Sequence, residues 1–143
     1  MISILELLRG EGAQVSYVRH NVKLAYLFGS QARGDAGPLS DVDVAVLFAP
    51  GPDKHGRMQS VLYLMHELGI LLRRDDVQVV DLLGASPLLR HRVYYDGKVL
   101  YCPDDVVRVQ FETTALRDYV DTAPLRRLVK KYLVEQFAEE VAG

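Results

Sequence analysis

The chain has 143 residues, of which 49% are hydrophobic and 25% are charged, so its composition and length suit one globular domain and exclude a disordered or fibrous protein. A net charge of −2 gives no general attraction to nucleic acid, one cysteine excludes an internal disulfide, and no apolar run is long enough to span a membrane. Because the N-terminus also lacks a signal-peptide pattern, we expect a cytoplasmic protein that binds neither membranes nor nucleic acid directly.

The predicted elements alternate between strands and helices after a helical N-terminus. Apolar residues three and four apart predict helices, and continuous apolar runs bounded by Gly or Pro predict buried strands. In chain order we expect helices at residues 2–8 and 15–20, strands at 24–28 and 42–48, a helix at 55–72, a strand at 77–83, a helix at 87–96 and a strand at 98–101. The predicted class is α/β (α+β), a small mixed sheet with flanking helices.

The C-terminal part of the chain is predicted to be a helical tail. From Asp104 onward the pattern is helical, with a break before Pro124 because the residue preceding a proline avoids the α conformation. We therefore expect a domain of residues 1–103 and a tail of residues 104–143. The tail carries more apolar residues than a lone surface helix needs, so it either packs on the domain or binds a partner.

Two acidic residues, Asp41 and Asp43, begin the strand predicted at residues 42–48. Alternate residues of a strand point to the same face, so the two carboxylates converge on one spot. Holding two like charges together is costly unless a cation lies between them. Hard oxygen ligands on a rigid strand suit Mg²⁺, which binds through one or two carboxylates together with substrate phosphates.

Gly29 and Ser30, at the end of the preceding strand, supply the complementary half of a nucleotide site. Glycine lets the backbone approach a phosphate closely, and a helix that opens at Ser30 directs N–H groups and a hydroxyl toward it. Arg33 lies one turn into that helix and can add charge-assisted bonds to a triphosphate. Each feature alone is common in ordinary turns, but their combination at this spacing between two strands is rare by chance.

The pattern of Gly29-Ser30, ten residues, then Asp41-Val42-Asp43 resembles the signature of the polymerase-β-like nucleotidyltransferase superfamily. The stretches 29–34 and 40–43 look like its minimal nucleotidyltransferase (MNT) branch, and the resemblance covers residues from about 20 to 102, with a looser likeness in the helical tail. The resemblance implies the polymerase-β-like fold and a transfer of a nucleoside monophosphate with pyrophosphate leaving. It assigns catalysis and Mg²⁺ binding to Asp41 and Asp43, and nucleotide binding to Gly29, Ser30, Arg33 and Ser40.

Members of this family carry a third carboxylate on the following strand, and here the matching position is Gln78. An amide cannot take up a proton and is a poorer metal ligand than a carboxylate. Asp76 lies on the same predicted strand face and could substitute at the edge of the strand, whereas Asp81 has the opposite parity and should face away. The presence of Gln78 in place of the third carboxylate should affect the transfer step rather than nucleotide binding.

The resemblance to MNT proteins also implies a partner. It suggests an antitoxin that uses ATP to adenylylate a tyrosine of a cognate HEPN ribonuclease toxin, with which it can form a hetero-oligomer. The HEPN motif Arg-x4–6-His does not occur in this chain, so the ribonuclease would be a separate protein. Two alternatives remain: a weak or inactive MNT-fold antitoxin that neutralises by binding alone, and a nucleotidyltransferase for small molecules, which generally has a larger acceptor-binding domain.

Overall fold

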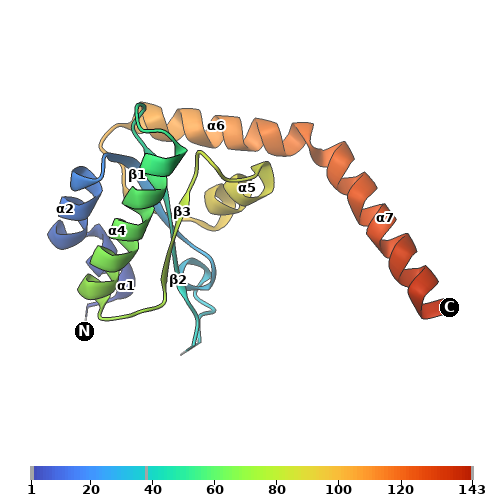
Figure 1. The fold of residues 1–143 in the computed structure, drawn as a ribbon, viewed down its shortest axis with the longest axis horizontal. Coiled ribbons are helices and arrows are strands. Elements are labelled where there is room, and N and C mark those ends of the chain that lie inside the picture. Colours follow the sequence, from blue (N-terminus) through green and yellow to red (C-terminus); the bar gives the residue numbers. More distant parts are fainter. Residues whose placement is uncertain (1, 38, 143) are drawn as a thin grey trace.

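The computed structural model describes residues 2–37 and 39–142. Figure 1 shows a sheet flanked by helices, with a long C-terminal helix that projects away from them. The helices are α1 (Ile4–Arg9), α2 (Glu11–Arg19), α3 (Ser30–Arg33), α4 (Lys54–Leu72), α5 (Pro87–Asp96), α6 (Asp105–Asp121) and α7 (Ala123–Ala142). The strands are β1 (Val22–Phe28), β2 (Val42–Phe48), β3 (Val77–Asp81) and β4 (Lys98–Tyr101).

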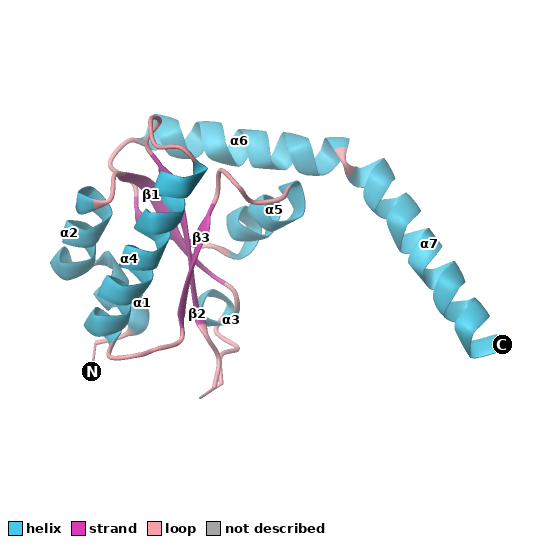
Figure 2. Ribbon diagram, in the orientation of Figure 1, coloured by secondary structure: helices cyan, strands magenta, loops and turns pink. Residues whose placement is uncertain are grey.

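The four strands form the mixed sheet that the sequence predicts, in the order β3-β2-β1-β4 (Figure 2). β1 is antiparallel to both β2 and β4, whereas β2 and β3 are parallel. Parallel strands need a long crossover, and α4 provides it between β2 and β3. In the ladders Asp43 lies opposite Phe28 of β1 on one side and Gln78 of β3 on the other. The end of β1 and the starts of β2 and β3 therefore meet at one end of the sheet.

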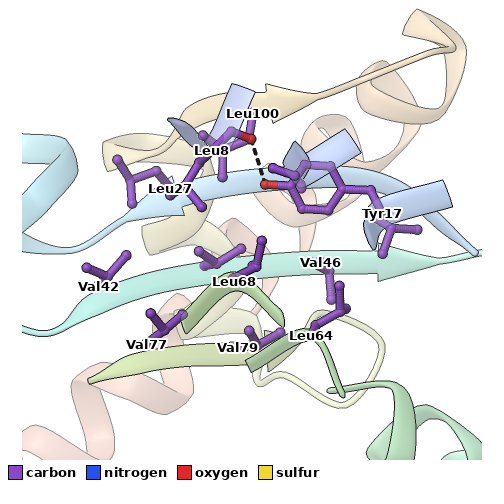
Figure 3. Packing of buried hydrophobic residues seen from close by; sticks show 14 of the residues in the cluster. Leu8, Tyr17, Leu27, Val42, Val46, Leu64, Leu68, Val77, Val79 and Leu100 are labelled. Carbon is purple, nitrogen blue, oxygen red and sulfur yellow. Dashed lines mark hydrogen bonds between the residues drawn. The ribbon is translucent and has the colours of Figure 1, made fainter. Parts of the chain in front are cut away.

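One face of the sheet is covered by α1, α2 and α4 (Figure 3). Leu64 and Leu68 of α4 are fully buried in this layer. The Tyr17 hydroxyl donates a hydrogen bond to the carbonyl of Leu8 at 2.8 Å, which satisfies the one polar group of a buried ring. The strand residues on this face include Val42, Val44 and Val46 of β2 and Val77 and Val79 of β3. They form the larger of two apolar clusters and fix which strand residues point to the opposite face.

The opposite face is covered by α5 and α6. Ala45 of β2 and Tyr26 of β1 pack there with Val93 of α5 and Phe111 of α6. The Tyr26 hydroxyl donates to Glu112 of α6 at 2.7 Å, and this bond joins α6 to the sheet. Because side chains alternate along a strand, Asp43 shares this face with Ala45.

The predicted elements are all present, with small shifts at their ends. β3 ends at Asp81 rather than at residue 83, because Asp81 accepts hydrogen bonds from two following N–H groups and starts a turn. Its carboxylate accepts from Leu83 at 3.0 Å and its carbonyl accepts from Gly84 at 3.1 Å. α2 begins at Glu11 rather than at residue 15, since the Gly10 carbonyl already accepts the Gln14 N–H.

The tail consists of α6, which packs on the domain, and α7, which does not. α6 buries Ala115 and half-buries Phe111, whereas the apolar side chains of α7 are exposed. Of the two expectations for the tail, packing on the domain applies to α6, and binding of a partner by α7 stays a prediction. The expected boundary at residue 103 falls between β4 and α6. In the described part of the chain, no helix has both the length and the apolar character that crossing a membrane requires.

Candidate functional site

The candidate site lies where β1 ends and β2 begins. Asp43 is paired with Phe28 in the antiparallel ladder, so Gly29 and Ser30, which follow Phe28 directly, lie beside the start of β2. Asp41 precedes β2 by one residue and is exposed, while Asp43 is half-buried. The fold thus brings together the two halves of the pattern that are separated by ten residues in the sequence.

Gly29 is the residue that packs most tightly against a predicted metal ligand. Its backbone has φ +73°, a conformation that L side chains rarely adopt. A Cβ atom at this position would lie 2.6 Å from Oδ2 of Asp43 and 3.5 Å from its Cγ. Only glycine therefore allows the backbone between β1 and α3 to approach the carboxylate this closely.

α3 presents Ser30 and Arg33 next to these carboxylates. The Gly29 carbonyl accepts the N–H groups of Ala32 and Arg33 at 3.1 Å each, which forms the single helical turn. Ser30 is half-buried at the first position of the helix. The Arg33 guanidinium is exposed and lies 3.3 Å from the carboxylate of Asp35 and 3.5 Å from that of Asp96. These long contacts leave Arg33 accessible to an anionic ligand.

The electrostatics of Asp43 indicate a carboxylate whose negative charge is only partly compensated. Burial raises its pKa, the neighbouring Asp41 raises it further, and the charge of Arg33 opposes both effects. Among the ion pairs and hydrogen bonds of the described residues, none involves the carboxylate of Asp41 or Asp43. A bound cation would favour the ionised form of Asp43 and offset the repulsion between the carboxylates of Asp41 and Asp43.

The third position, Gln78, is aligned with Asp43 across the parallel β2–β3 ladder. It is exposed and shares the strand face of Asp43, as the family pattern requires. Asp81 faces the other way, as predicted, and pairs with Arg57 of α4 at 2.8 Å. The position that carries a carboxylate in the family pattern therefore holds an amide next to the two aspartates.

Asp76, the predicted substitute, is already bound by an arginine. Arg74 donates to both of its oxygens, at 2.7 Å and 2.6 Å, and this hydrogen-bonded pair lowers the pKa of Asp76. Arg74 also donates to the Ser40 carbonyl at 2.9 Å, directly before Asp41. Sequence reasoning predicted no such link, although the adjacent Arg74 and Asp76 are a visible signal for it. The arrangement commits Asp76 to holding the loop rather than to a metal.

Ser40 contributes to the same loop. Its hydroxyl accepts the Gly37 N–H at 2.9 Å, and its own N–H donates to the Gly37 carbonyl at 3.1 Å. The hydroxyl proton is still available for a further hydrogen bond, for example to a phosphate. The geometry thus gives Ser40 a structural task beside its predicted role in nucleotide binding.

The donor set fits Mg²⁺ that arrives with a nucleotide. Within residues 2–37 and 39–142, no group of three or more His, Cys, Asp and Glu side chains is arranged to hold a metal ion. Mg²⁺ characteristically uses one or two protein carboxylates and completes its shell with water and phosphate oxygens. Asp41 and Asp43 supply that number of carboxylates, and Ser30 and Arg33 lie where phosphates would need partners.

Comparison with protein families agrees with this geometry. The family "Polymerase beta, Nucleotidyltransferase" matches residues 14–106. The chain is 35% identical over 94 residues to protein adenylyltransferase MntA of Shewanella oneidensis, which covers 64% of each chain. It is 35% identical over 85 residues to protein adenylyltransferase MntA of Aphanizomenon flos-aquae, covering 56% of this chain and 57% of that protein. The aligned part thus spans less than two thirds of both relatives.

Solved structures are similar over a larger part of the chain. A toxin–antitoxin crystal structure with AMP-PNP matches with a TM-score of 0.70 and 27% identity, covering 86% of this chain and 96% of the other. The MNT antitoxin in complex with tri-AMPylated Shewanella oneidensis HEPN toxin matches with a TM-score of 0.69 and 25% identity, covering 91% and 98%. These similarities extend beyond residue 106 into the helical tail.

Proposed function

Because the chain belongs to the polymerase β nucleotidyltransferase family, we propose that it transfers AMP from ATP to a tyrosine hydroxyl of a HEPN toxin and thereby acts as its antitoxin. The observation that carries the proposal is the pair of neighbouring carboxylates, Asp41 and Asp43, which have no ion pair or hydrogen bond among the described residues, with Asp43 packed closely against Gly29. The relatives support it, since they are named protein adenylyltransferases and one similar antitoxin was solved with an AMPylated toxin. We place the activity in the cytoplasm, where ATP is abundant.

The residues divide the task between phosphate and metal binding. Ser30 and the backbone that follows Gly29 bind the triphosphate, and Arg33 pairs with its charge. Asp41 and Asp43 hold Mg²⁺, which when bound stabilises negative charge on the phosphate oxygens. Gln78, at the edge of this site, can donate or accept a hydrogen bond to a bound substrate, but its amide cannot take up a proton.

The proposed reaction is an in-line substitution at the α-phosphorus of ATP. The tyrosine oxygen forms a bond to this phosphorus, and the bond to the oxygen that bridges to the β-phosphate breaks. Pyrophosphate leaves with the electron pair of that bond, and the hydroxyl proton passes to solvent water. The chain contributes chiefly by positioning and by electrostatic stabilisation, as is general for phosphoryl and nucleotidyl transfer.

One observation favours a second candidate function, an antitoxin that neutralises by binding alone. Gln78 stands beside Asp43 where a third carboxylate would activate the attacking hydroxyl. The neighbouring acid, Asp76, is held by Arg74 and is not free to replace it. A protein with this site would bind nucleotide and toxin but transfer AMP slowly.

The experiment uses a HEPN protein from the same organism as this chain. The purified chain, ATP and Mg²⁺ are incubated with it, and the intact mass of the HEPN protein is measured over time. We expect the mass to increase by one or more AMP groups with the wild-type chain and not with the variant carrying Asp41→Ala and Asp43→Ala. A stable complex without any mass increase would reject the transferase and support binding alone.

A further inference from the structure

The apolar side chains of α7 form a continuous exposed row. Leu125, Val129, Leu133, Phe137 and Val141 follow one another at intervals of four residues, and between 48% and 72% of each side chain is exposed. Neighbouring residues four apart on a helix lie side by side, so the row is a continuous apolar strip that winds gradually around α7. A surface of this kind is unusual on a monomeric protein and marks a binding site for another molecule.

The first four side chains of the row line a groove between α7 and α5. Leu88 of α5 faces Leu125, Val129 and Leu133 across an open groove of about 600 Å³, with Phe137 at its far end. The charged groups of Arg126 and Lys130 lie at its border. An apolar groove with a charged border fits an amphipathic helix of a partner protein.

The position of α7 is braced rather than free. His91 of α5 stacks on the Tyr119 ring of α6 at 3.6 Å between ring centres. The Arg126 guanidinium of α7 lies 3.7 Å from the centre of the same ring and donates to the Tyr119 carbonyl at 2.7 Å. These contacts fix the angle at which α7 leaves α6 (Figure 1). A docking surface that is ordered before binding loses less entropy when the partner binds.

The similarity to the antitoxin solved with its toxin extends into α7. Its match covers 91% of the present chain, whereas residues 1–122, which precede α7, make up only about 85% of it, so part of α7 must lie in the matched region. The nucleotidyltransferase family itself ends at residue 106. Part of the projecting helix therefore has a counterpart in an antitoxin that assembles with a HEPN toxin, and it lies outside the residues that match the nucleotidyltransferase family.

The groove and the candidate site share one side of the sheet. α5 packs on the face to which Ala45 and Asp43 belong, and the groove opens beside α5. Figure 2 shows α5, α3 and α7 on the same side of the strands, with α7 diverging from the sheet. A partner seated against α7 can therefore also extend over the end of the sheet where the carboxylates lie.

From these observations we propose that the α5–α7 groove docks an amphipathic helix of the HEPN toxin and holds the toxin so that its acceptor tyrosine reaches Asp41 and Asp43. This inference rests on the proposed partner but adds the surface that selects it. The groove supplies affinity for the toxin, and the carboxylates supply the chemistry.

The test compares two variants that each add one negative charge to α7. Leu133→Glu places the charge in the centre of the groove, and Ala138→Glu places it on the part of the helix that does not line the groove. Binding of the same HEPN protein is measured by calorimetry without ATP, so the result does not depend on catalysis. We expect Leu133→Glu to weaken binding at least 100-fold and Ala138→Glu to change it less than threefold.

The kinetics with ATP and Mg²⁺ provide a second measurement. We expect Leu133→Glu to raise the KM for the HEPN protein while the KM for ATP stays unchanged, and circular dichroism to show the same helix content in both variants. Equal binding of the toxin by wild type and Leu133→Glu would overturn the proposal. So would a wild-type dimer in sedimentation experiments that Leu133→Glu dissociates with toxin binding unaffected, because the groove would then hold a second copy of this chain.

A failure of the proposed function gives a different result. If the wild-type chain binds the toxin through the groove but never transfers AMP, the docking surface is supported and the transferase is rejected. If AMP is transferred and Leu133→Glu behaves as wild type, the transferase is supported and the docking surface is rejected.

Discussion

Asp43 and Glu67 are both partly buried carboxylates, yet their surroundings shift their pKa values in opposite directions. Burial raises the pKa of Asp43, and the charge of Asp41 raises it further. Burial would also raise the pKa of Glu67, but hydrogen bonds from His20 and Ser16 outweigh this effect and lower it. The two carboxylates therefore differ in what the protein itself provides for their charge.

Glu67 has its partners within the fold. It lies on α4 and accepts a hydrogen bond from the Ser16 hydroxyl of α2 at 3.1 Å, and it also pairs with Arg19 and contacts the His20 ring. These bonds tie α2 to α4. Its charge is compensated, so Glu67 stabilises the structure and has no capacity left for a ligand.

The sheet fixes the position of Asp43, but no ion pair or hydrogen bond within the described residues compensates the charge of its carboxylate. The close approach of Gly29 holds the carboxylate in place without neutralising it. Groups that a fold positions without satisfying are expected at functional sites, where the ligand provides the missing interaction. The comparison predicts that changes at Asp43 affect activity and that changes at Glu67 affect stability.

The largest expected effect follows from Asp43→Asn. The variant keeps the shape of the side chain and removes its charge, so AMP transfer to the toxin should fall about 1,000-fold, corresponding to a loss of several kcal/mol of charge stabilisation by the metal. Thermal unfolding should show no loss of stability, because an unfavourably buried charge is removed. Asp75→Asn, an exposed neutralisation nearby, is the control. Transfer by Asp43→Asn within tenfold of wild type would contradict the assignment.

The next largest effect is expected when Gly29 is replaced, and Gly34, which also has a positive φ, provides the comparison. In Gly29→Ala the new Cβ would collide with Asp43. In Gly34→Ala, at φ +83°, the new Cβ would have no atom of a non-neighbouring residue within 4 Å. Both variants should be destabilised by about 1–3 kcal/mol because of backbone strain. Only Gly29→Ala should also displace the carboxylate and reduce transfer about 100-fold. Urea unfolding and transfer rates measure the two effects, and equal loss of transfer in both variants would refute the specific role of Gly29.

A smaller effect is expected when a carboxylate is placed at position 78. Gln78→Asp adds a proton acceptor and metal ligand opposite Asp43 on the neighbouring strand. Transfer should increase about tenfold, a modest part of what general base catalysis can provide. Gln78→Ala serves as the control for loss of the amide. An unchanged or lower rate in Gln78→Asp would show that the site works without a third carboxylate.

The smallest effect concerns the compensated carboxylate. Glu67→Gln should lower the free energy of unfolding by about 1–2 kcal/mol at pH 7 and leave AMP transfer unchanged. Because the folded pKa of Glu67 is lowered, its stabilisation is present above its unfolded pKa of about 4.3 and is lost as the pH falls through the folded value. Denaturation curves of wild type and variant should therefore converge in acid. A constant difference across this pH range would argue against the ionised Glu67 as the cause.

Much of the fold could be predicted from the sequence because its signals are local. The apolar run that ends at Gly29 and the spacing of apolar residues along 55–72 depend only on neighbouring residues, and they indicated β1 and α4 correctly. The polar pattern of the site was visible for the same reason, since Asp41 and Asp43 lie two residues apart on one strand face. The family pattern pointed to Gln78 as the third position, and the parallel ladder places it beside Asp43.

Contacts between distant residues could not be predicted in this way. The pairing of Arg33 with Asp96 joins residues 63 positions apart, and the bond from Arg74 to the Ser40 carbonyl crosses 34 positions. The latter changes the interpretation of Asp76, which parity alone presented as a free carboxylate. Such links depend on the packing of α3, α4 and α5 around the sheet.

The sequence by itself determined the order of elements, the family pattern and the residues that carry charge at the site, because local spacing governs each of them. Only the tertiary structure decided which of those charges are compensated and where the tail goes. Compensation depends on which side chains the folded chain brings within hydrogen-bonding distance, as for Asp43 and Glu67. The exposure of α7 depends on the angle set by the stack of His91, Tyr119 and Arg126, which no local pattern encodes.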